Sequence, residues 1–403
     1  MGDEHAVVIG AGIAGPVVAM ALQRIGVECT VYERHPGPSE GVGAFLTVAA
    51  NGLDALAAID LHREVAAAGF STPKMSMWSG TGRRLGTLDH GYRPSGATTT
   101  TIERAALYRT LLAAATDRGI RFEYGRRLTG IRERRDEVVA AFADGSEARG
   151  TFLVGADGIW STARKLVDPG AAEPEYCGLI GSGGYATGVD LPPEPDTFQF
   201  VFGRRAFFGY IAREGGLVWW FANVPTRPEP SREALAALQP DDEAQRLRAL
   251  FADDAPPLAA ILDAPSLGRF PSMPMHTLTP PRAWSRGRVV LVGDAAHSTS
   301  PSSGQGASLA IEDAIELARC LRDREPLADA FTAYQRLREQ RVMRILVEAR
   351  RTNSDKAAGP IGRVFRDLAM PIVLKRVLTP EAREWLTGHH IEFDRPIDAD
   401  LAP

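Results

Sequence analysis

The sequence has few cysteines, and none of them has a partner at a recognisable spacing. Cys29, Cys177 and Cys320 are the only three in 403 residues. They form neither a CxxC pair nor a cysteine and histidine pattern of the kind that binds a metal or builds a disulfide framework. We therefore expect no metal site, and we expect a protein of a reducing, cytoplasmic setting.

Long apolar runs and an excess of one charge are also missing. No stretch reaches the roughly 18 consecutive apolar residues that a membrane-spanning helix needs. The N-terminus MGDEHAVVIGAG lacks the basic start and cleavage site of a signal peptide. The net charge of -4 provides no basic field for nucleic acid or an anionic membrane, so we expect neither partner. A small molecule is left as the expected ligand of a monomer or a homodimer.

The composition, 44% hydrophobic and 24% charged, is that of a globular protein long enough for two domains. The chain opens with AVVIG, GPVVAMALQRIG and ECTVYER, which alternate between strand and helix patterns. This βαβ order predicts a parallel sheet covered by helices. Residues 176–275 contain short, aromatic-rich segments separated by turns, which are typical of antiparallel hairpins.

We therefore predict an α/β fold with a Rossmann-like, parallel-sheet domain formed by residues 1–175 and 276–350. A mostly antiparallel β-sheet domain, residues 176–275, is inserted between these parts, and residues 351–403 form a C-terminal helical segment. From residue 311 to about 356 the pattern is strongly helical and partly basic. We expect its arginines to lie on a solvated face, paired with nearby acids; they are Arg336, Arg338, Arg341, Arg344, Arg350 and Arg351.

The first motif that carries chemistry is GAGIAG, residues 10–15, between the first strand and the first helix. Glycines at these positions permit a tight turn and let the backbone approach a pyrophosphate at the positive N-terminus of the helix. Glu33 closes the second strand, where a carboxylate can accept hydrogen bonds from ribose hydroxyls. The pattern predicts dinucleotide binding. The alternative is an ordinary tight turn followed by a surface glutamate.

A second glycine cluster, GLIGSGGYATG at residues 178–188, precedes no helix and follows no clear βαβ strand. We interpret it as a flexible turn that leads into a sheet. Enzymes that hold two dinucleotides in two such folds should show two fingerprints, and this chain has one.

Two further motifs follow in order along the chain. FLVGADGIWSTARKLV contains Asp157-Gly158, Ser161 and Arg164, and RVVLVGDAAHSTSPSSGQGASLAIEDA contains Gly293-Asp294 and Gly304-Gln305-Gly306. An Asp-Gly pair by itself predicts only a turn. Together with GAGIAG and Glu33-Arg34, however, these motifs resemble those of the single-component FAD-dependent aromatic hydroxylases, the family typified by p-hydroxybenzoate hydroxylase.

The resemblance covers most of the chain, from about residue 5 to about residue 350. GVGAFLTVAANGLDALAAIDL resembles the family's loop beside the flavin, and Arg104 in TIERAALYRTLL matches its FAD-contacting arginine. Two departures stand out. Ala49-Ala50-Asn51 replaces the Pro-Asn-Ala of many relatives, and Ser302-Ser303 replaces a bulkier pair before Gly-Gln-Gly, so the substrate size of relatives does not transfer to this chain.

The resemblance implies a tightly bound FAD, transient NADH or NADPH, and O₂. In this family reduced FAD reacts with O₂ to a C4a-hydroperoxide, which transfers a hydroxyl group to an electron-rich aromatic or polyketide-like substrate. Asp294 would accept hydrogen bonds from ribityl hydroxyls, and Pro301 would lie near the reactive side of the ring. Gly304-Gln305-Gly306 would start a helix whose N–H groups face the pyrimidine end and stabilise the anionic reduced flavin. The full set of expected FAD contacts is Gly10, Gly12, Ile13, Ala14, Gly15, Glu33, Arg34, Ala44, Arg104, Leu128, Asp157, Gly293, Asp294, Pro301, Gly304, Gly306 and Ala307.

The cofactor carries the chemistry in such enzymes, so no catalytic side chain is assigned. We interpret His297 as a packing or hydrogen-bonding residue of its motif. His90 and His276 are candidate bases for a phenolic substrate, but the sequence gives neither of them a partner. Aromatic side chains of the inserted domain are the candidate wall of the substrate site, with sheet core as the alternative for each; they are Tyr185, Phe200, Phe202, Phe208, Tyr210 and Trp220.

Other functions stay open at this point. A related oxygenation, epoxidation or Baeyer–Villiger insertion, needs the same flavin site. GLVWWFANVP loosely resembles the Trp-x-Trp-x-Ile-Pro signature of flavin halogenases, which a separate reductase supplies with reduced flavin. A binding protein that holds FAD and sequesters a metabolite predicts no NAD(P)H oxidation with any ligand. A structural protein that has lost its flavin predicts a colourless preparation, and the glycines and Asp294 argue against it.

Overall fold

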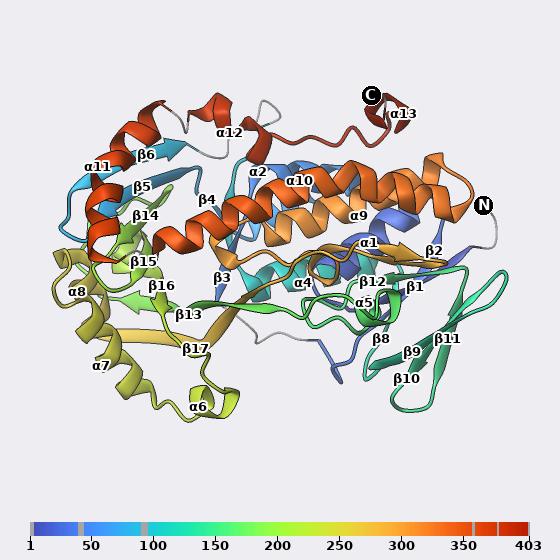
Figure 1. Ribbon diagram of the computed structural model, residues 1–403, viewed down its shortest axis with the longest axis horizontal. Helices are drawn as coiled ribbons and strands as arrows, with labels where there is room; N and C mark the ends of the chain where they lie inside the picture. Colours follow the sequence, from blue (N-terminus) through green and yellow to red (C-terminus); the bar gives the residue numbers. More distant parts are fainter. Residues whose placement is uncertain (1–3, 39–43, 90–95, 357–358, 377–378, 402–403) are drawn as a thin grey trace.

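The computed structural model describes residues 4–38, 44–89, 96–356, 359–376 and 379–401. His90 and the first three residues of the GVGAFL segment lie outside this range. Figure 1 shows two connected parts, a sheet-and-helix layer around β1, α1, α9 and α10 and a second sheet around β13 to β17. The α/β fold class is therefore confirmed.

A six-stranded sheet is the centre of the first part. Its order is β18-β19-β12-β1-β2-β8, and every neighbouring pair except β18 and β19 is parallel. The four C-terminal residues of β1 and all residues of β12 and β19 are buried, as expected for parallel strands with helices on both faces. The strands are β1 (His5–Ile9), β2 (Glu28–Tyr32), β8 (Arg121–Glu123), β12 (Phe152–Gly155), β18 (Ser285–Arg286) and β19 (Val289–Leu291).

Two small antiparallel sheets flank this sheet. One consists of β9 (Leu128–Glu133), β10 (Val138–Phe142) and β11 (Glu147–Gly150), and the other of β3 (Phe45–Val48), β7 (Thr100–Glu103) and β4 (Phe70–Ser71). In the second, Phe45 is directly opposite Glu103, and Phe70 is opposite Thr101. Opposed residues of antiparallel strands point to the same face, so these side chains share one face of the sheet.

The second large sheet has seven strands in the order β17-β13-β16-β15-β14-β5-β6. Only the β5–β14 pair is parallel, so the prediction of a mostly antiparallel sheet is confirmed. The glycine cluster at residues 178–188 lies mainly within β13, so its interpretation as a turn is wrong. The strands are β5 (Lys74–Ser79), β6 (Arg84–Asp89), β13 (Glu175–Thr187), β14 (Thr197–Phe202), β15 (Phe207–Ala212), β16 (Val218–Pro225) and β17 (Ser266–Thr277).

Two strands of this sheet come from outside the predicted insertion, because β5 and β6 belong to residues 74–89. The long helix α10 (Leu327–Lys356) also runs through residue 350, where a boundary was expected. The division of the chain into domains stays a prediction. These connections show that residues 176–275 do not build their sheet alone.

Helices cover both sheets. α9 packs against α1, α2 and α10 in the first part, whereas α7 and α8 cover one face of the seven-stranded sheet (Figure 1). The remaining bounds are α1 (Ala14–Arg24), α2 (Ala50–Leu56), α3 (His62–Ala67), α4 (Arg104–Asp117), α5 (Thr162–Val167), α6 (Arg232–Ala236), α7 (Pro240–Phe251), α8 (Pro256–Leu262), α9 (Gly306–Asp323), α11 (Pro360–Arg376), α12 (Pro380–Thr387) and α13 (Asp398–Leu401).

The basic pattern on α10 is not a single solvated face. Arg336, Arg344, Arg350 and Arg351 are exposed, but Arg338 is only 1% exposed, and the side chain of Arg341 is 9% exposed. The expectation of a solvated face is therefore wrong for these two residues, although the expectation of acidic partners is right. The position of an arginine in a sequence pattern does not show which side of the helix faces the core.

The partners of the buried arginines are two consecutive acids of α9. Arg338 contacts Glu312 (Nη2–Oε2 2.6 Å) and Asp313 (Nε–Oδ1 2.8 Å). Arg341 contacts Glu312 through its Nε and its Nη2, each at 2.9 Å. Burial by itself would raise the pKa of Glu312 and of Asp313. For Glu312, the guanidinium groups of Arg338 and Arg341 outweigh the effect of burial. For Asp313, His297 and Arg338 together outweigh it. The pKa values of both acids therefore lie below their ordinary range.

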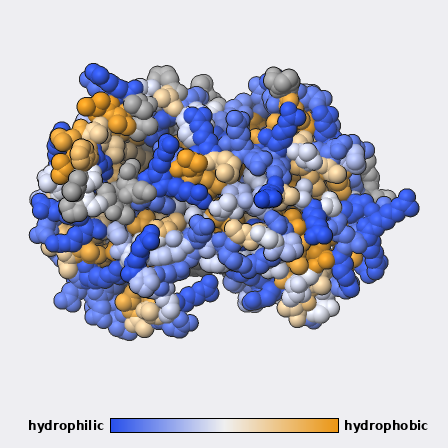
Figure 2. All heavy atoms as spheres, in the orientation of Figure 1, coloured by the Kyte–Doolittle hydropathy of each residue, from blue (hydrophilic) through white to orange (hydrophobic). Residues whose placement is uncertain are grey.

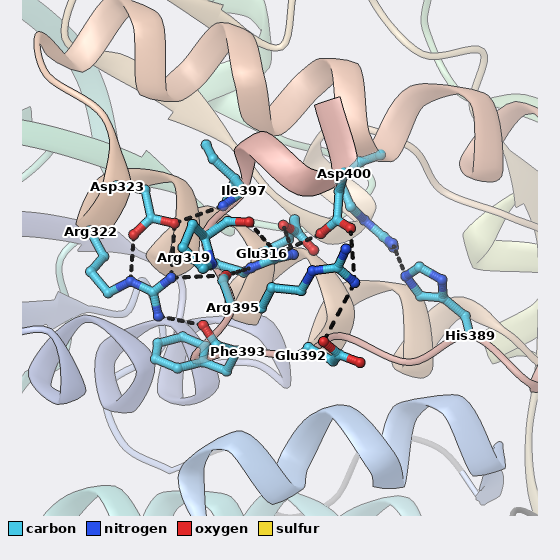
Figure 3. Close-up of polar contacts among 12 residues, drawn as sticks. Glu316, Arg319, Arg322, Asp323, His389, Glu392, Phe393, Arg395, Ile397 and Asp400 are labelled. Atoms are coloured by element: carbon cyan, nitrogen blue, oxygen red, sulfur yellow. Dashed lines mark hydrogen bonds and ion pairs between the residues drawn. The ribbon is translucent and has the colours of Figure 1, made fainter. Parts of the chain in front are cut away.

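The C-terminal segment returns to the first part and binds the end of α9 (Figure 3). Arg319 and Arg322 donate to backbone carbonyls of Phe393 and Arg395, and Arg319 also pairs with Asp400. The Phe393 ring lies under the guanidinium of Arg322, 5.1 Å from its centre. These contacts fix residues far beyond the predicted FAD-binding part against its core.

Among the residues that the structure describes, no helix has the length and apolar character required to cross a bilayer. The same residues contain no group of three or more histidine, cysteine, aspartate or glutamate side chains placed to hold a metal ion.

We predict that Arg338→Met strongly destabilises the protein, because it leaves two buried carboxylates without their shared cation. The free energy of unfolding in urea should fall by about 3–5 kcal/mol. Arg351→Met, on the same helix but with a side chain 76% exposed, should change it by less than about 0.5 kcal/mol. Equal small effects of the two substitutions would contradict a stabilising role for the buried pair.

Candidate active site

The GAGIAG turn connects β1 to α1, and its three glycines serve different purposes. Gly10 has a φ of +104°, and a Cβ there would lie 2.5 Å from the carbonyl oxygen of Ala156. A Cβ at Gly15 would overlap the carbonyl oxygen of Gly10. By contrast, a Cβ at Gly12 would meet nothing within 4 Å. Gly10 and Gly15 are therefore required by packing, whereas Gly12 opens onto space beside the N-terminus of α1.

Glu33 lies against this turn. Its Oε2 accepts a hydrogen bond from the Ala11 N–H at 2.8 Å, and its Oε1 accepts one from the His35 N–H at 3.0 Å. The residue is 8% exposed. The alternative of a surface glutamate is thereby ruled out, because the side chain is buried and helps to shape the turn. Arg34, the next residue, is exposed.

Two helix N-termini are open to an anionic group. Neither α1 nor α9 has a side-chain cap or an acid in its first turn. An uncapped N-terminus leaves backbone N–H groups available and carries a partial positive charge. The residues around both ends include the predicted FAD contacts Ile13, Ala14, Gly306 and Ala307. A dinucleotide with a pyrophosphate at α1 and an electron-rich ring at α9 fits this pair of helix ends.

Asp294 follows β19 in a 3₁₀ turn, Gly293–Ala295. Gly293 has a φ of +57°, and a Cβ there would lie 2.9 Å from the Ala310 Cβ, so the turn packs directly on α9. Burial raises the pKa of Asp294, while His297 and Arg104 act to lower it. Arg104, the first residue of α4, is thus near Asp294, as the resemblance implied for two residues that contact one cofactor.

The Asp-Gly motif has a structural role in addition to any contact with FAD. The Asp157 carboxylate accepts hydrogen bonds from Thr162 N (2.7 Å) and Ala163 N (3.1 Å), so it caps α5. Arg164, 1% exposed, donates to the carbonyl oxygens of Ile159 (2.8 Å) and Ala295 (3.1 Å). It therefore ties the Asp-Gly motif to the turn that carries Asp294.

His297 is a packing and hydrogen-bonding residue, as predicted. It is 1% exposed, its Nε2 lies 2.6 Å from Asp313 Oδ2, and its ring contacts Trp284 at 4.9 Å between centroids. The same Asp313 oxygen accepts a hydrogen bond from Gly293 N at 2.8 Å. Asp313 therefore supports the turn before Asp294. His276, by contrast, has a partner that the sequence did not reveal, because its Nε2 lies 2.9 Å from Glu229.

The remaining predicted contacts are distributed along the same region. The Ala44 carbonyl accepts a hydrogen bond from Arg104 N at 3.2 Å. Leu128 is buried at the start of β9. Pro301 is exposed and begins the short 3₁₀ turn Pro301–Ser303, which Gly304 follows with a φ of +63°.

Sequence reasoning missed several residues behind the site. Asn51 donates to Gln305 Oε1 at 3.0 Å and to Glu312 Oε1 at 2.6 Å, and Ala49 N donates to the Ser308 hydroxyl at 3.0 Å. The Ala-Ala-Asn departure is thus attached directly to the first turns of α9. The available signal was a pair of acids, Glu312 and Asp313, inside an otherwise apolar stretch.

The six predicted aromatic residues do not share one face of the seven-stranded sheet. Successive residues of a strand point to opposite faces. Phe208 and Trp220 are 0% exposed and pack with Phe251 beneath α7 and α8, and Tyr210 packs on the same cluster. For these three the alternative of sheet core describes their positions, and they do not line a substrate site on the opposite face of the sheet. Phe202 is on the opposite face but lies under the Arg366 guanidinium of α11.

Tyr185 and Phe200 are on the face turned toward β3, β4 and β7, which we call the inner face. Tyr185 contacts Phe45 and Trp219, and its hydroxyl donates to Glu103 Oε1 at 3.3 Å. Further rings complete the inner face and were not predicted, although alternation along β16 could have identified two of them. Phe198, Trp219, Phe221 and Phe270 belong to the seven-stranded sheet itself, and Phe45 and Phe70 contact these rings from β3 and β4.

Comparisons with known proteins agree with this geometry. A family described as "FAD binding domain" matches residues 3–349. The 3-amino-4-hydroxybenzoate 2-monooxygenase of Streptomyces cremeus is 32% identical over 412 residues, covering 100% of this chain and 98% of the relative. The FAD-dependent urate hydroxylase of Klebsiella pneumoniae is 31% identical over 352 residues, covering 86% of this chain and 88% of the relative.

Solved structures give the same result. The crystal structure of Klebsiella pneumoniae HpxO complexed with FAD and uric acid matches with a TM-score of 0.78 at 27% identity, covering 92% of this chain and 93% of that chain. The resemblance drawn from the three motifs is thereby confirmed. The chain belongs to the FAD binding domain family, and it is an FAD-dependent monooxygenase of the aromatic hydroxylase type.

Proposed function

We propose that this monooxygenase hydroxylates a planar aromatic molecule that carries an acidic group, and that Arg213 binds the acidic group. The observation that carries the proposal is the position of Arg213 directly after β15. Its guanidinium carbon lies 3.6 Å from the centre of the Phe70 ring. Phe70 in turn contacts Trp219 at 5.0 Å, so Arg213 is at the edge of the inner aromatic face.

Arg213 has no ion-pair partner among the residues that the structure describes. Within the described part of the chain its guanidinium makes no hydrogen bond and no ion pair, and the residue is only partly exposed. Burial lowers the pKa of Arg213, which Glu214 opposes only in part. A partly desolvated guanidinium is stabilised by a planar anion such as a carboxylate, which it can bind through two parallel hydrogen bonds.

The inner face suits the rest of such a molecule. Aromatic rings favour stacked or edge contacts with other rings, and this face supplies them from both sheets. The pair formed by Tyr185 and Glu103 adds hydrogen-bonding groups for a ring hydroxyl. Burial, and then Glu103, raise the pKa of Tyr185, so the tyrosine keeps its proton and can act as a donor.

We propose that FAD lies between Glu33 and the N-terminus of α9. Glu33 and the N-terminus of α1 would hold the adenosine and pyrophosphate part, and Asp294 and Arg104 the ribityl part. Bound FAD, reduced by NADH or NADPH, supplies the transfer of an oxygen atom from O₂. The chain's own residues position the substrate and exclude water from that reaction.

The relatives reported above are hydroxylases or monooxygenases, and no structural feature favours the sequestering or halogenase alternatives. We therefore propose neither. The substrates of those relatives, aminohydroxybenzoate and urate, are planar aromatic molecules. They are consistent with the class proposed here. A panel of aromatic ligands would identify this chain's substrate within that class.

The proposed role of Arg213 leads to a prediction about substrate binding. Purified protein should show flavin absorbance that NADH or NADPH bleaches quickly only when a suitable ligand is present. Among matched pairs of hydroxylated aromatic acids and their amides, the acid should be the better ligand. In Arg213→Met, the Kd for the acid, measured from the change in flavin absorbance, should rise about 10–100-fold, while the Kd for the amide should hardly change.

Two controls accompany this test. Arg205→Met removes an exposed arginine that pairs with Asp253, and it should leave both Kd values unchanged. Arg213→Lys keeps the charge but loses the planar fork, so it should restore binding only in part. An equal loss of acid and amide binding in Arg213→Met would show that the residue supports structure and not the acidic group.

The proposed role of Asp294 leads to a prediction about FAD and pH. Ribityl hydroxyls donate hydrogen bonds to the ionised form of Asp294, whereas burial raises the pKa of Asp294 above its ordinary 3.8 in the FAD-free chain. FAD affinity should therefore rise with pH until Asp294 is ionised and then level off. Asp294→Asn should bind FAD about tenfold more weakly above that pH and should lose this pH dependence. Equilibrium dialysis of FAD across the pH range measures both effects, and an unchanged pH profile in the variant would assign the dependence to another group.

A further inference from the structure

The helix α11 presents four of its apolar side chains to solvent. Val364, Phe365, Leu368 and Ile372 are 59%, 70%, 60% and 60% exposed. Their spacing places them on one side of the helix. Figure 2 shows the corresponding apolar patch at the upper left of the molecule, where Figure 1 places α11. We call these four residues the α11 stripe. Single exposed apolar residues are ordinary, but a continuous stripe of this kind indicates a binding surface.

The opposite side of α11 holds the helix in place. Leu374 is 6% exposed and packs with Leu85 and Leu88 of β6, and Met370 lies against the same cluster. The Arg366 guanidinium lies 4.6 Å from the centre of the Phe202 ring. The helix is therefore anchored without any contribution from the exposed stripe. Substitutions in the stripe should leave the fold intact.

The charges next to the stripe are mainly positive. Lys375 and Arg376 are exposed at the C-terminal end of α11, and Arg363 is partly exposed at its N-terminal end. The one acid of the helix, Asp367, is already bonded to Arg366 at 2.8 Å. The stripe thus lies between cationic ends, although the whole chain has a net charge of -4.

A second copy of the chain does not suit this surface. A stable protein interface takes about 20–30 residues from each partner, whereas the stripe consists of four side chains on one helix. Two copies meeting along α11 would also bring their positive ends close together. A bilayer with anionic headgroups meets both conditions, because it accepts a narrow apolar stripe and attracts the flanking cations.

We propose that α11 docks the protein onto the surface of a bilayer that contains anionic phospholipid. The stripe enters the boundary between headgroups and acyl chains, and Lys375 and Arg376 contact the lipid phosphates. The attachment is peripheral and involves no membrane-spanning helix. It differs from the expectation drawn from net charge, because net charge averages over the whole surface. It does not depend on the proposed substrate.

Vesicle flotation of the FAD-loaded protein tests this proposal. The wild type should float with vesicles of phosphatidylglycerol and phosphatidylcholine and much less with phosphatidylcholine alone. The double variant Phe365→Ser with Leu368→Ser should lose at least about tenfold in its partition coefficient, because two bulky side chains no longer enter the bilayer. Raising the salt from about 0.1 to about 0.5 M should weaken wild-type binding several-fold.

The matched control removes equally apolar residues elsewhere. Met343 and Val347 on α10 are 42% and 46% exposed, and the double variant Met343→Ser with Val347→Ser should bind vesicles like the wild type. Circular dichroism and the flavin spectrum show that each variant is folded. The proposal is overturned if the wild type ignores anionic vesicles, if both double variants bind equally well, or if sedimentation shows a dimer that only the α11 variant abolishes.

Discussion

The shared ion pair between α9 and α10 is the interaction on which the rest of the site depends. Glu312 and Asp313 have no access to water, so their charges depend on buried partners: Arg338 contacts both acids, Arg341 also contacts Glu312, and His297 contacts Asp313. Each acid also has a second task. Asp313 accepts the Gly293 N–H beside the turn that carries Asp294, and Glu312 accepts from Asn51 of α2. The helices α9 and α10, the turn before Asp294 and the start of α2 are thus set relative to one another by one charged cluster.

The alternation of side chains along β-strands separates the face of the second sheet that α7 and α8 cover from its inner face. Phe208 and Trp220 face α7 and α8, and they stabilise the sheet by burying apolar area. Trp219, one residue away, faces β3 and β4 and contributes to the inner face. Neighbouring residues of a strand point to opposite faces of the sheet, because the side-chain period of a strand is two residues. Arg213 is on the inner face for the same reason.

The sequence by itself determined the features that depend on local backbone chemistry. The GAGIAG turn, its position between a strand and a helix, and Glu33 at the end of the second strand all follow from residue types at fixed spacing. The parallel order of the first part also follows, since consecutive strands joined by a helix must run in the same direction. His297 could be assigned a supporting role because its motif already accounted for the cofactor. These inferences need only neighbours in sequence.

The tertiary structure alone decided which charged and aromatic residues are buried, and where. Arg338 and Arg351 belong to one basic helix, yet only the first meets acids from α9, since helix rotation is set by packing partners distant in sequence. The strands from residues 74–89 join the second sheet because strand pairing is a long-range event without a local signal. In the sequence, the residues of the α11 stripe form the pattern of an ordinary amphipathic helix. Periodicity shows that apolar residues share a face, but it does not show whether that face meets the core or the solvent.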